Sequence, residues 1–415
     1  METRRLQFDD LLAIKRRIYA LSYAFEFVQI CDSNQTNDAL NIGEYELIAA
    51  FGNNCEILNS LTGLEAALTR DTWKFGAFHY PSNWKRPLET LKFFEPDWVI
   101  RINRDSNEVE LIENKSSDLK LDELIKLMKS GSIETPRIHP DFVFKPVTSK
   151  HQYLQSVESI RDKILHGVFY EMNYCIEFNA DWLVGDLLPY MLKLNEKSAA
   201  PFAVYAKTDT QEVLCSSPER FLRKTGDVLV SQPIKGTNHL KEGEGNLQQM
   251  AALKASEKER AENVMIVDLV RNDLARVCKS GSVKVDELFG TYPFKTLNHM
   301  ISTVSGTLQA NTSFTAIFEA LFPMGSMTGA PKIEVMKHIE QFEDRQRGLY
   351  SGCIGYVEPN GNFDFNVVIR TLEKEHTGKH IHYKVGSAIT FDSVPELEYD
   401  ECLLKGQRLE SIFRE

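Results

Sequence analysis

The stretch CIGYVEPNGNFDFNVVIRTL, Cys353 to Leu372, places two apolar runs on either side of Asn360-Gly361. Asn-Gly favours the type I′ turns that join antiparallel strands, so the stretch predicts a β-hairpin. The segment HIHYKVGSAITF, residues 380–391, supplies a following strand. Hairpins alternate here with amphipathic helices and show no regular βαβ rhythm. This pattern predicts an α+β fold with large antiparallel β-sheets flanked by helices.

The composition limits the classes of function. The chain has 415 residues, of which 42% are hydrophobic and 26% charged, as in ordinary globular proteins. Its formal net charge of −11 argues against a nucleic-acid or anionic-membrane partner. It says nothing against a small anionic substrate, because local charge decides that. No apolar run approaches the roughly 18 residues of a membrane span.

The cysteines and the N-terminus indicate the expected compartment. Seven scattered cysteines contain no C-x-x-C pair, so neither a disulfide framework nor a structural zinc site is predicted. The first ten residues, METRRLQFDD, lack the apolar core of a secretory signal. We therefore expect a cytoplasmic protein.

The chain shows one candidate boundary. Three prolines interrupt IETPRIHPDFVFKPVTSKHQY, residues 133–153, and we place the boundary between an N-terminal region, 1–148, and a second region, 149–415. Within the first region, DWVIRINRDSNEVELIEN predicts a hairpin around Arg104–Asn107. No G-x-G-x-x-G or Walker loop is present, so nucleotide binding has no support in the sequence.

Lys235 stands in the segment SQPIKGTNHL, residues 231–240. The preceding residues 227–232 alternate and are rich in β-branched side chains, which predicts a strand. Pro233 cannot donate to a ladder, so we expect the strand to end there and Lys235 to lie in a polar, mobile loop. From this peptide alone, Lys235 is either a reactive amine or an ordinary solvated lysine.

Two predicted helices each carry paired carboxylates. Glu259 and Glu262 share a face of SEKERAENVMIVDLVRNDLARVC, residues 256–278, and Glu398 and Glu401 share a face of ELEYDECLLKGQRLESIF, residues 396–413. Lys405 lies one turn beyond Glu401. Two such faces can clamp a hard divalent cation, which prefers oxygen ligands. Solvated acidic faces are the commoner alternative.

Three further segments carry candidate binding or catalytic groups. The glycine-containing loop 325–329 leads to Pro331 and a predicted helix, which suits either an anion site or a plain helix start. His299 lies in a predicted strand, where it serves in proton transfer or in packing. Arg370 ends an apolar strand and suits either carboxylate capture or a surface salt bridge. Cys353 lies in SGCIG, whose glycine spacing is wrong for a nucleophile elbow, so we expect it to pack in a strand.

Together these segments resemble the chorismate-utilising enzymes, a family that includes anthranilate, aminodeoxychorismate, isochorismate and salicylate synthases. The resemblance covers Ser149 to the C-terminus and is looser before it, through WKFGAFHYP. It rests on these motifs in order: SSPERF, PIKGT, EKERAENVMIVDLVRND, HMISTVSG, FPMGSMTGAPK, RGLYSGCIGYV, IRT and VGSAITFDSVPELEYDECLLK. It implies an anthranilate synthase large-subunit fold, with a chorismate-binding catalytic domain over 149–415.

The resemblance also implies the roles of individual residues. Mg²⁺ would be held by Glu262 and Glu401, with Glu259 and Glu398 assisting through water, and would bind the ring carboxylate of chorismate near Lys405. The enolpyruvyl carboxylate would be held by Arg370, Tyr350 and the backbone of Gly386 and Ser387. The loop with Ser326 and Thr328 would close the pocket. Glu219 would act as general acid/base, and His299 would lie near the C4 hydroxyl.

Lys235 narrows the resemblance to aminodeoxychorismate synthase component I, which reads Pro-Ile-Lys-Gly-Thr where anthranilate synthases read Pro-Ile-Ala-Gly-Thr. A lysine amine can attack C2 as the C4 hydroxyl leaves, and ammonia can then attack C4 and expel the lysine. The nucleophile must be the free amine, so we expect the pKa of Lys235 to fall below about 10.4. Burial and a neighbouring Mg²⁺ both act in that direction.

The source of nitrogen and the alternatives follow from the same resemblance. Residues 171–175, EMNYC, lack the base lysine of isochorismate-forming relatives, which argues against water as the nucleophile. We expect ammonia to come from a separate glutamine amidotransferase subunit, because the chain ends near the family's last helix. Two alternatives stay open: an anthranilate or 2-amino-2-deoxyisochorismate synthase, and a non-catalytic chorismate-binding subunit.

Overall fold

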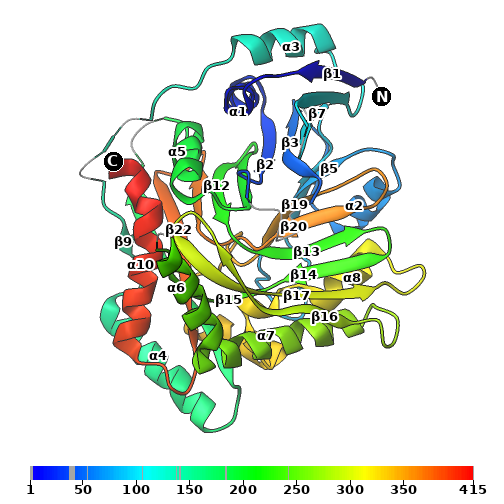
Figure 1. The fold of residues 1–415 in the computed structure, drawn as a ribbon. Helices are drawn as coiled ribbons and strands as arrows, with labels where there is room; N and C mark the ends of the chain where they lie inside the picture. Colours follow the sequence, from blue (N-terminus) through cyan, green and yellow to red (C-terminus); the bar gives the residue numbers. More distant parts are fainter. Residues whose placement is uncertain are drawn as a thin grey trace.

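The computed structural model describes residues 3–36, 43–53, 55–104, 106–136, 138–139, 142–182, 185–241 and 243–414. In these residues the chain forms two antiparallel sheets with helices on their outer faces (Figure 1). The predicted α+β class is therefore confirmed. Over the same residues, no helix combines the length and the apolar character needed to cross a membrane.

The first sheet contains 12 of the described strands in the order β1-β8-β7-β3-β2-β11-β12-β21-β22-β10-β18, with β9 paired to β10. The bounds are β1 Thr3–Gln7, β2 Phe27–Asp32, β3 Tyr45–Gly52, β7 Trp98–Asn103, β8 Glu108–Glu113, β9 Lys145–Pro146, β10 Glu171–Asp181, β11 Phe202–Lys207, β12 Gln211–Ser217, β18 Gly329–Ala330, β21 Thr371–Glu375 and β22 His380–Ile389. The predicted hairpin of residues 98–113 is the β7–β8 pair. Asp105, in its connection, lies outside the described residues.

The second sheet contains 10 of the described strands in the order β15-β17-β14-β13-β20-β19-β5-β6-β4, with β16 paired to β17. The bounds are β4 Ile57–Leu58, β5 Lys74–Phe78, β6 Leu91–Phe94, β13 Arg220–Thr225, β14 Val228–Gln232, β15 Ile234–His239, β16 Lys284–Pro293, β17 Leu297–Thr307, β19 Cys353–Val357 and β20 Phe363–Asn366. Both sheets take strands from either side of residue 148. The boundary at 148/149 stays a prediction.

The helices cover the outer faces of the sheets. They are α1 Leu11–Ala20, α2 Leu61–Leu68, α3 Leu121–Ser130, α4 Lys150–Leu165, α5 Leu188–Ser198, α6 Glu244–Ala255, α7 Glu257–Ala275, α8 Phe314–Leu321, α9 Lys332–Phe342 and α10 Pro395–Arg414, with the short 3₁₀ turns η1 Leu21–Ala24 and η3 Gly325–Met327. In Figure 1, α10 runs beside β22 and α4, and α7 runs along the second sheet. The predicted acidic helices are thus α7 and α10.

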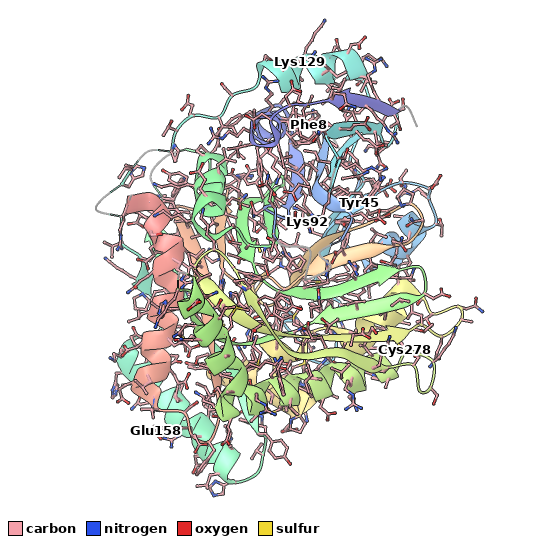
Figure 2. The ribbon with its side chains drawn as sticks, viewed as in Figure 1. Phe8, Tyr45, Lys92, Lys129, Glu158 and Cys278 are labelled. Atoms are coloured by element: carbon pink, nitrogen blue, oxygen red, sulfur yellow. The ribbon has the colours of Figure 1, made fainter. Side chains whose placement is uncertain are left out.

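Side chains fill the space between the sheets and their helices (Figure 2), and buried apolar side chains form several cores there. The largest core joins one face of the first sheet to its helices, including Tyr153 of α4 and Phe413 of α10. A second core lies between the second sheet, α7 and α8. Cys353 is fully buried in β19 within this second core, as predicted, and burial raises the pKa of its thiol. These cores pack α10 against the first sheet and α7 against the second.

The hairpin of residues 353–372 forms, but with a different turn and a different end. Strand β19 pairs with β20 from Val357 opposite Phe363, so the loop has more than two residues, and Gly361 has a positive φ whereas Asn360 does not. The predicted type I′ turn is therefore wrong. Arg370 does not end this strand either. The chain leaves the second sheet after Asn366 and joins the first at Thr371, and Arg370 has a φ of 53° at this crossing.

Candidate active site

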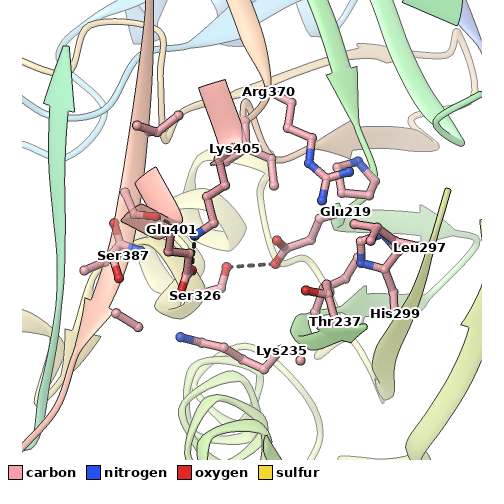
Figure 3. A pocket seen from close by; sticks show the side chains of 18 of the residues that line it. Glu219, Lys235, Thr237, Leu297, His299, Ser326, Arg370, Ser387, Glu401 and Lys405 are labelled. Carbon is pink, nitrogen blue, oxygen red and sulfur yellow. Dashed lines mark hydrogen bonds and ion pairs between the residues drawn. The ribbon is translucent and has the colours of Figure 1, made fainter. Parts of the chain in front are cut away.

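A cavity of about 410 Å³ lies between the two sheets, next to α7, α10 and η3 (Figure 3). The lining includes every site residue predicted from the sequence except Thr328. These are Glu219, Lys235, Glu259, Glu262, His299, Ser326, Tyr350, Arg370, Gly386, Ser387, Glu398, Glu401 and Lys405. Segments separated by up to about half of the chain thus meet at one cavity.

Thr328 lies behind the cavity wall. Its side chain is fully buried, and its hydroxyl donates to the carbonyl oxygens of Met324 and Gly325, at 3.1 and 3.2 Å. These bonds brace the η3 turn, which presents Ser326 and Met327 to the cavity. The direct role predicted for Thr328 therefore has no support in this arrangement, since its hydroxyl is engaged within its own loop.

Lys235 lies in a strand rather than in the polar loop predicted for it. Strand β14 ends before Pro233 as expected, but β15 begins at Ile234 and pairs with β17. The register shifts between Ile234 and Thr237, and Gly236 has a φ of 93°. Such bulges redirect side chains, and here the Lys235 side chain points into the cavity (Figure 3).

The charge state of Lys235 also differs from the prediction. Burial lowers the pKa of the amine as expected, but the carboxylates of Glu171 and Glu262 outweigh it, and the pKa is raised overall. Glu171 is the nearest of these groups, with its Oε1 2.7 Å from Nζ. The expected free amine is thus an ammonium ion near neutral pH.

Glu219 has the properties of a proton-transfer group. It is buried in the turn between β12 and β13, where its Oε1 accepts a 2.8 Å hydrogen bond from the hydroxyl of Ser326. Burial raises its pKa to about 7, although Ser326 and the charges of Lys235 and Arg370 oppose the shift. A carboxyl group with a pKa near neutrality can both give and take a proton at working pH.

Arg370 carries a positive charge into the cavity. Among the described residues, no ion-pair or hydrogen-bond partner of its guanidinium is found, and Glu219 is the nearby anion that favours its charge. Burial and the neighbouring Arg408 lower its pKa to about 10, so it stays protonated at neutral pH. A half-buried guanidinium without a counter-ion is a strong site for a carboxylate ligand.

His299 and Tyr350 complete the polar wall. His299 is buried in β17 against Phe294, with ring centroids 4.7 Å apart, and burial lowers its pKa, so the imidazole is neutral. Its Nδ1 has no hydrogen-bond partner among the described residues.

A Cβ at Gly386 would lie 3.1 Å from the Tyr350 hydroxyl and 2.5 Å from Asn173 Oδ1. A side chain at position 386 would therefore crowd the Tyr350 hydroxyl, whereas glycine lets this hydroxyl and the Gly386 backbone line the cavity together.

The acidic faces of α7 and α10 meet at the cavity. Burial raises the pKa of Glu259 and of Glu262, and the charge of Glu401 adds to the shift at Glu259. On α10, Lys405 lies 2.6 Å from Glu401 and lowers its pKa against burial, and Glu398 accepts a hydrogen bond from Ser387. A bound cation would offset the repulsion by which these carboxylates raise one another's pKa.

These carboxylates fit a hard cation in chemistry but are not a complete metal site. Over the residues the structure describes, no group of three or more His, Cys, Asp or Glu side chains is arranged to hold a metal ion. Mg²⁺ commonly takes one or two protein carboxylates and fills its other positions with water and substrate oxygens. The all-oxygen donor set agrees with such a site.

The structure adds residues that sequence reasoning missed. Asn173, Lys384 and Arg408 line the cavity, and Glu171 lies behind Lys235. Asn173 and Glu171 belong to EMNYC, a segment for which the sequence predicted only the absence of a base lysine. Arg408 stands one turn beyond Lys405 on α10, and continuing that helical face would have found it.

Comparison with known proteins agrees with this geometry. Residues 27–411 match the family model described as chorismate binding enzyme. The chain is 34% identical over 318 residues to aminodeoxychorismate synthase component 1 of Klebsiella aerogenes, covering 75% of this chain and 68% of that protein. This chain belongs to the chorismate-binding enzymes.

Members of this family differ in length and in sequence. A probable chloroplastic aminodeoxychorismate synthase of Oryza sativa subsp. japonica is 40% identical over 273 residues, which are 64% of this chain and 30% of that protein. Among solved structures, the menaquinone-specific isochorismate synthase from Escherichia coli superposes with a TM-score of 0.80 at 17% identity, covering 99% of this chain and 94% of that one. Anthranilate synthase component I from Streptococcus pneumoniae gives a TM-score of 0.74 at 21% identity, covering 99% and 92%. The predicted anthranilate synthase large-subunit fold is therefore confirmed.

Proposed function

We propose that this chorismate-binding enzyme aminates chorismate at C4 with ammonia, giving 4-amino-4-deoxychorismate, the precursor of para-aminobenzoate for folate synthesis. The observation that carries the proposal is Lys235, a buried amine aimed into the cavity between Glu219 and the acidic faces of α7 and α10. The names of the relatives in Klebsiella aerogenes and Oryza sativa support the same reaction.

Chorismate has two carboxylates, and the cavity offers a separate region to each. The enolpyruvyl carboxylate would bind the unpaired guanidinium of Arg370 beside Tyr350 and the backbone of Gly386 and Ser387. The ring carboxylate would lie at the other end, near Lys405 and the α7–α10 carboxylates. The two anchors would place the ring between Lys235 and Glu219, so that the reacting groups approach from opposite ends of its diene.

The covalent route has two steps that balance in atoms and charge. In the first, Nζ of neutral Lys235 bonds to C2, the two ring double bonds shift from C1=C2 and C5=C6 to C1=C6 and C4=C5, and the C4–O bond breaks. Protonated Glu219 supplies the proton with which the hydroxyl leaves as water, which its pKa of about 7 permits. His299, neutral and buried, would hydrogen-bond the C4 hydroxyl as it departs.

In the second step, ammonia attacks C4, both double bonds return to C1=C2 and C5=C6, and the C2–N bond to Lys235 breaks. Ammonia loses one proton to the carboxylate that Glu219 became in the first step, and Lys235 is restored as an amine. Water is thus exchanged for ammonia overall. We infer that a glutamine amidotransferase subunit supplies the ammonia, as the words "component 1" in the names of the bacterial relatives suggest. The chain by itself should use ammonia and not glutamine.

We also propose Mg²⁺ as the cofactor. Glu262 and Glu401 would hold the ion, with Glu259 and Glu398 assisting through water. When bound, the ion supplies positive charge that fixes the ring carboxylate.

The expected cytoplasmic location stays a prediction. All seven cysteines are free, which agrees with a reducing compartment.

Trapping of the covalent intermediate tests the proposal. Protein incubated with chorismate and Mg²⁺ in the absence of ammonia should gain the mass of chorismate less water on a peptide that contains Lys235. The Lys235→Ala variant should show no such adduct. If the wild-type protein forms product at full rate and no adduct is ever trapped, direct attack of ammonia replaces the covalent route.

A further inference from the structure

Glu171 is the residue in direct contact with the amine of Lys235. It is the first residue of β10, its side chain is 1% exposed, and its Oε1 accepts from Lys235 Nζ at 2.7 Å. Its other oxygen, Oε2, is buried and has no hydrogen-bond partner among the described residues. Glu171 is not part of the cavity lining, so it reaches a ligand only through Lys235.

The position of Glu171 is fixed by the backbone around it. Its partner across the sheet is Ala330 of β18, and a Cβ at Gly329 would lie 2.1 Å from the Glu171 carbonyl oxygen. Gly329 has a φ of 144°, a backbone conformation that residues with a side chain rarely adopt. The loop that presents Ser326 to the cavity therefore also holds Glu171 behind the lysine.

We propose that Glu171 is a positioning residue that holds Lys235 as an ammonium ion and so sets the pH at which this amine becomes a nucleophile. The chemical part of this inference rests on the proposed role of Lys235. The ion pair itself stands on the contact, the burial of both side chains and the unpaired second oxygen. Removing the charge of Glu171 should therefore free the amine at lower pH.

The other charges that face Lys235 do not replace Glu171. On α7, Glu262 adds to the effect, and Glu262 is itself 3.9 Å from Lys258 and near Glu259. Glu219 bonds to Ser326, and on α10 Glu401 is paired with Lys405. The pKa of Lys235 is raised by Glu171, Glu262 and Glu219 against burial, with Glu171 the largest of the three. Among these carboxylates, Glu171 is the one that accepts a hydrogen bond from the Lys235 amine. It is also not one of the proposed ligands of the cation.

Competitive labelling of amines measures the proposed effect without any catalytic step. Substrate-free protein is treated with trace amine-selective acylating reagent from pH 7 to 12, and labelling of each lysine peptide is quantified by mass spectrometry. Wild-type Lys235 should titrate above the ordinary lysine value of about 10.4. In Glu171→Gln its midpoint should fall by about 1–3 pH units, the usual effect of one close opposite charge.

Two control variants separate charge from structural damage. Glu171→Asp keeps the charge and should keep the high midpoint. Glu212→Gln removes a buried carboxylate of β12 that lies 3.3 Å from Lys374 and outside the cavity lining, and it should leave the titration of Lys235 unchanged.

The adduct experiment, run across the same pH range, links the pair to the reaction. Below both midpoints, Glu171→Gln should form the Lys235 adduct at least about tenfold faster than wild type, because more of its amine is neutral. A wild-type Lys235 midpoint at or below the ordinary value of about 10.4, an unchanged midpoint in Glu171→Gln, or an upward shift would overturn the inference. If the midpoint falls as expected and no adduct forms in any variant, the inference about Glu171 holds and the covalent function fails.

Discussion

The hydroxyl of Ser326 in η3 donates to the carboxylate of Glu219 at 2.8 Å, which joins the glycine-containing loop to the proposed proton-transfer group. This bond stabilises the ionised carboxylate and so opposes the effect of burial, which raises the pKa of Glu219 to about 7. The contact thus tunes the pH at which the proposed acid is protonated.

The variant Ser326→Ala should extend activity to higher pH. Loss of the donated hydrogen bond removes a stabiliser of the ionised form, so the pKa of Glu219 should rise further. Because the proposed first step needs protonated Glu219, the alkaline limb of the kcat/KM profile should move up, by about one pH unit or less. An unchanged alkaline limb, with the acid limb moving up instead, would show that Glu219 is required as a base.

The variant Gly236→Ala should impair the site as well as the backbone. Gly236 has a φ of 93°, and a Cβ there would lie 2.8 Å from Glu259 Oε2. Gly226→Ala is a matched control, since its φ is 57° and a Cβ there would meet nothing within 4 Å. Both should lose roughly 1–2 kcal/mol of stability in thermal unfolding. Only Gly236→Ala should also lose activity, and equal activity in the two would contradict the close approach.

The variants Glu262→Ala and Glu401→Ala should abolish Mg²⁺-dependent activity and leave the protein folded. Burial raises the pKa of Glu262, so removing its charge should not weaken the fold at neutral pH, where that charge is unfavourable. Activity against Mg²⁺ concentration and thermal unfolding would measure the two effects. Full turnover of the wild type in excess chelator would refute the cation site.

The variant Arg370→Gln should raise KM for chorismate about 10- to 100-fold, the usual value of a hydrogen bond to a charged group. The guanidinium is protonated and has no counter-ion among the described residues, so its charge is available to a carboxylate. Arg370→Lys should rescue little, because an ammonium group lacks the planar pair of donors. Steady-state kinetics would decide, and an unchanged KM in both variants would move the enolpyruvyl carboxylate elsewhere.

The sequence predicted the elements and most of the residues that line the cavity, because periodic patterns and ordered motifs are local properties. It failed where contacts between distant segments decide the conformation. The sequence predicts a loop at Lys235 because Pro233 ends β14, but it does not show locally that Ile234–His239 pairs with β17. It predicts a strand end at Arg370, whereas the chain crosses between the two sheets there, with a φ of 53°.

The prediction of a neutral Lys235 failed for the same reason, since contacts between distant segments set its charge state. Glu171 is 64 residues away in the chain and reaches the amine only because β10 and β15 border one cavity. The prediction rested on burial and on a neighbouring Mg²⁺, and burial does lower the pKa of the amine as expected. The carboxylates that reverse it come from other segments, and a single sequence does not show which of them meet.

The position of the new amine in the product tests the central claim most directly. Purified protein with chorismate, Mg²⁺ and ¹⁵N-ammonium at alkaline pH would be examined by NMR for coupling of nitrogen to C4 or to C2. The account predicts ¹⁵N on C4 in the wild type, and loss or redirection of this product in Lys235→Ala. A wild-type product with ¹⁵N on C2, or anthranilate with release of pyruvate, would contradict the account and assign the chain to the other amination reaction.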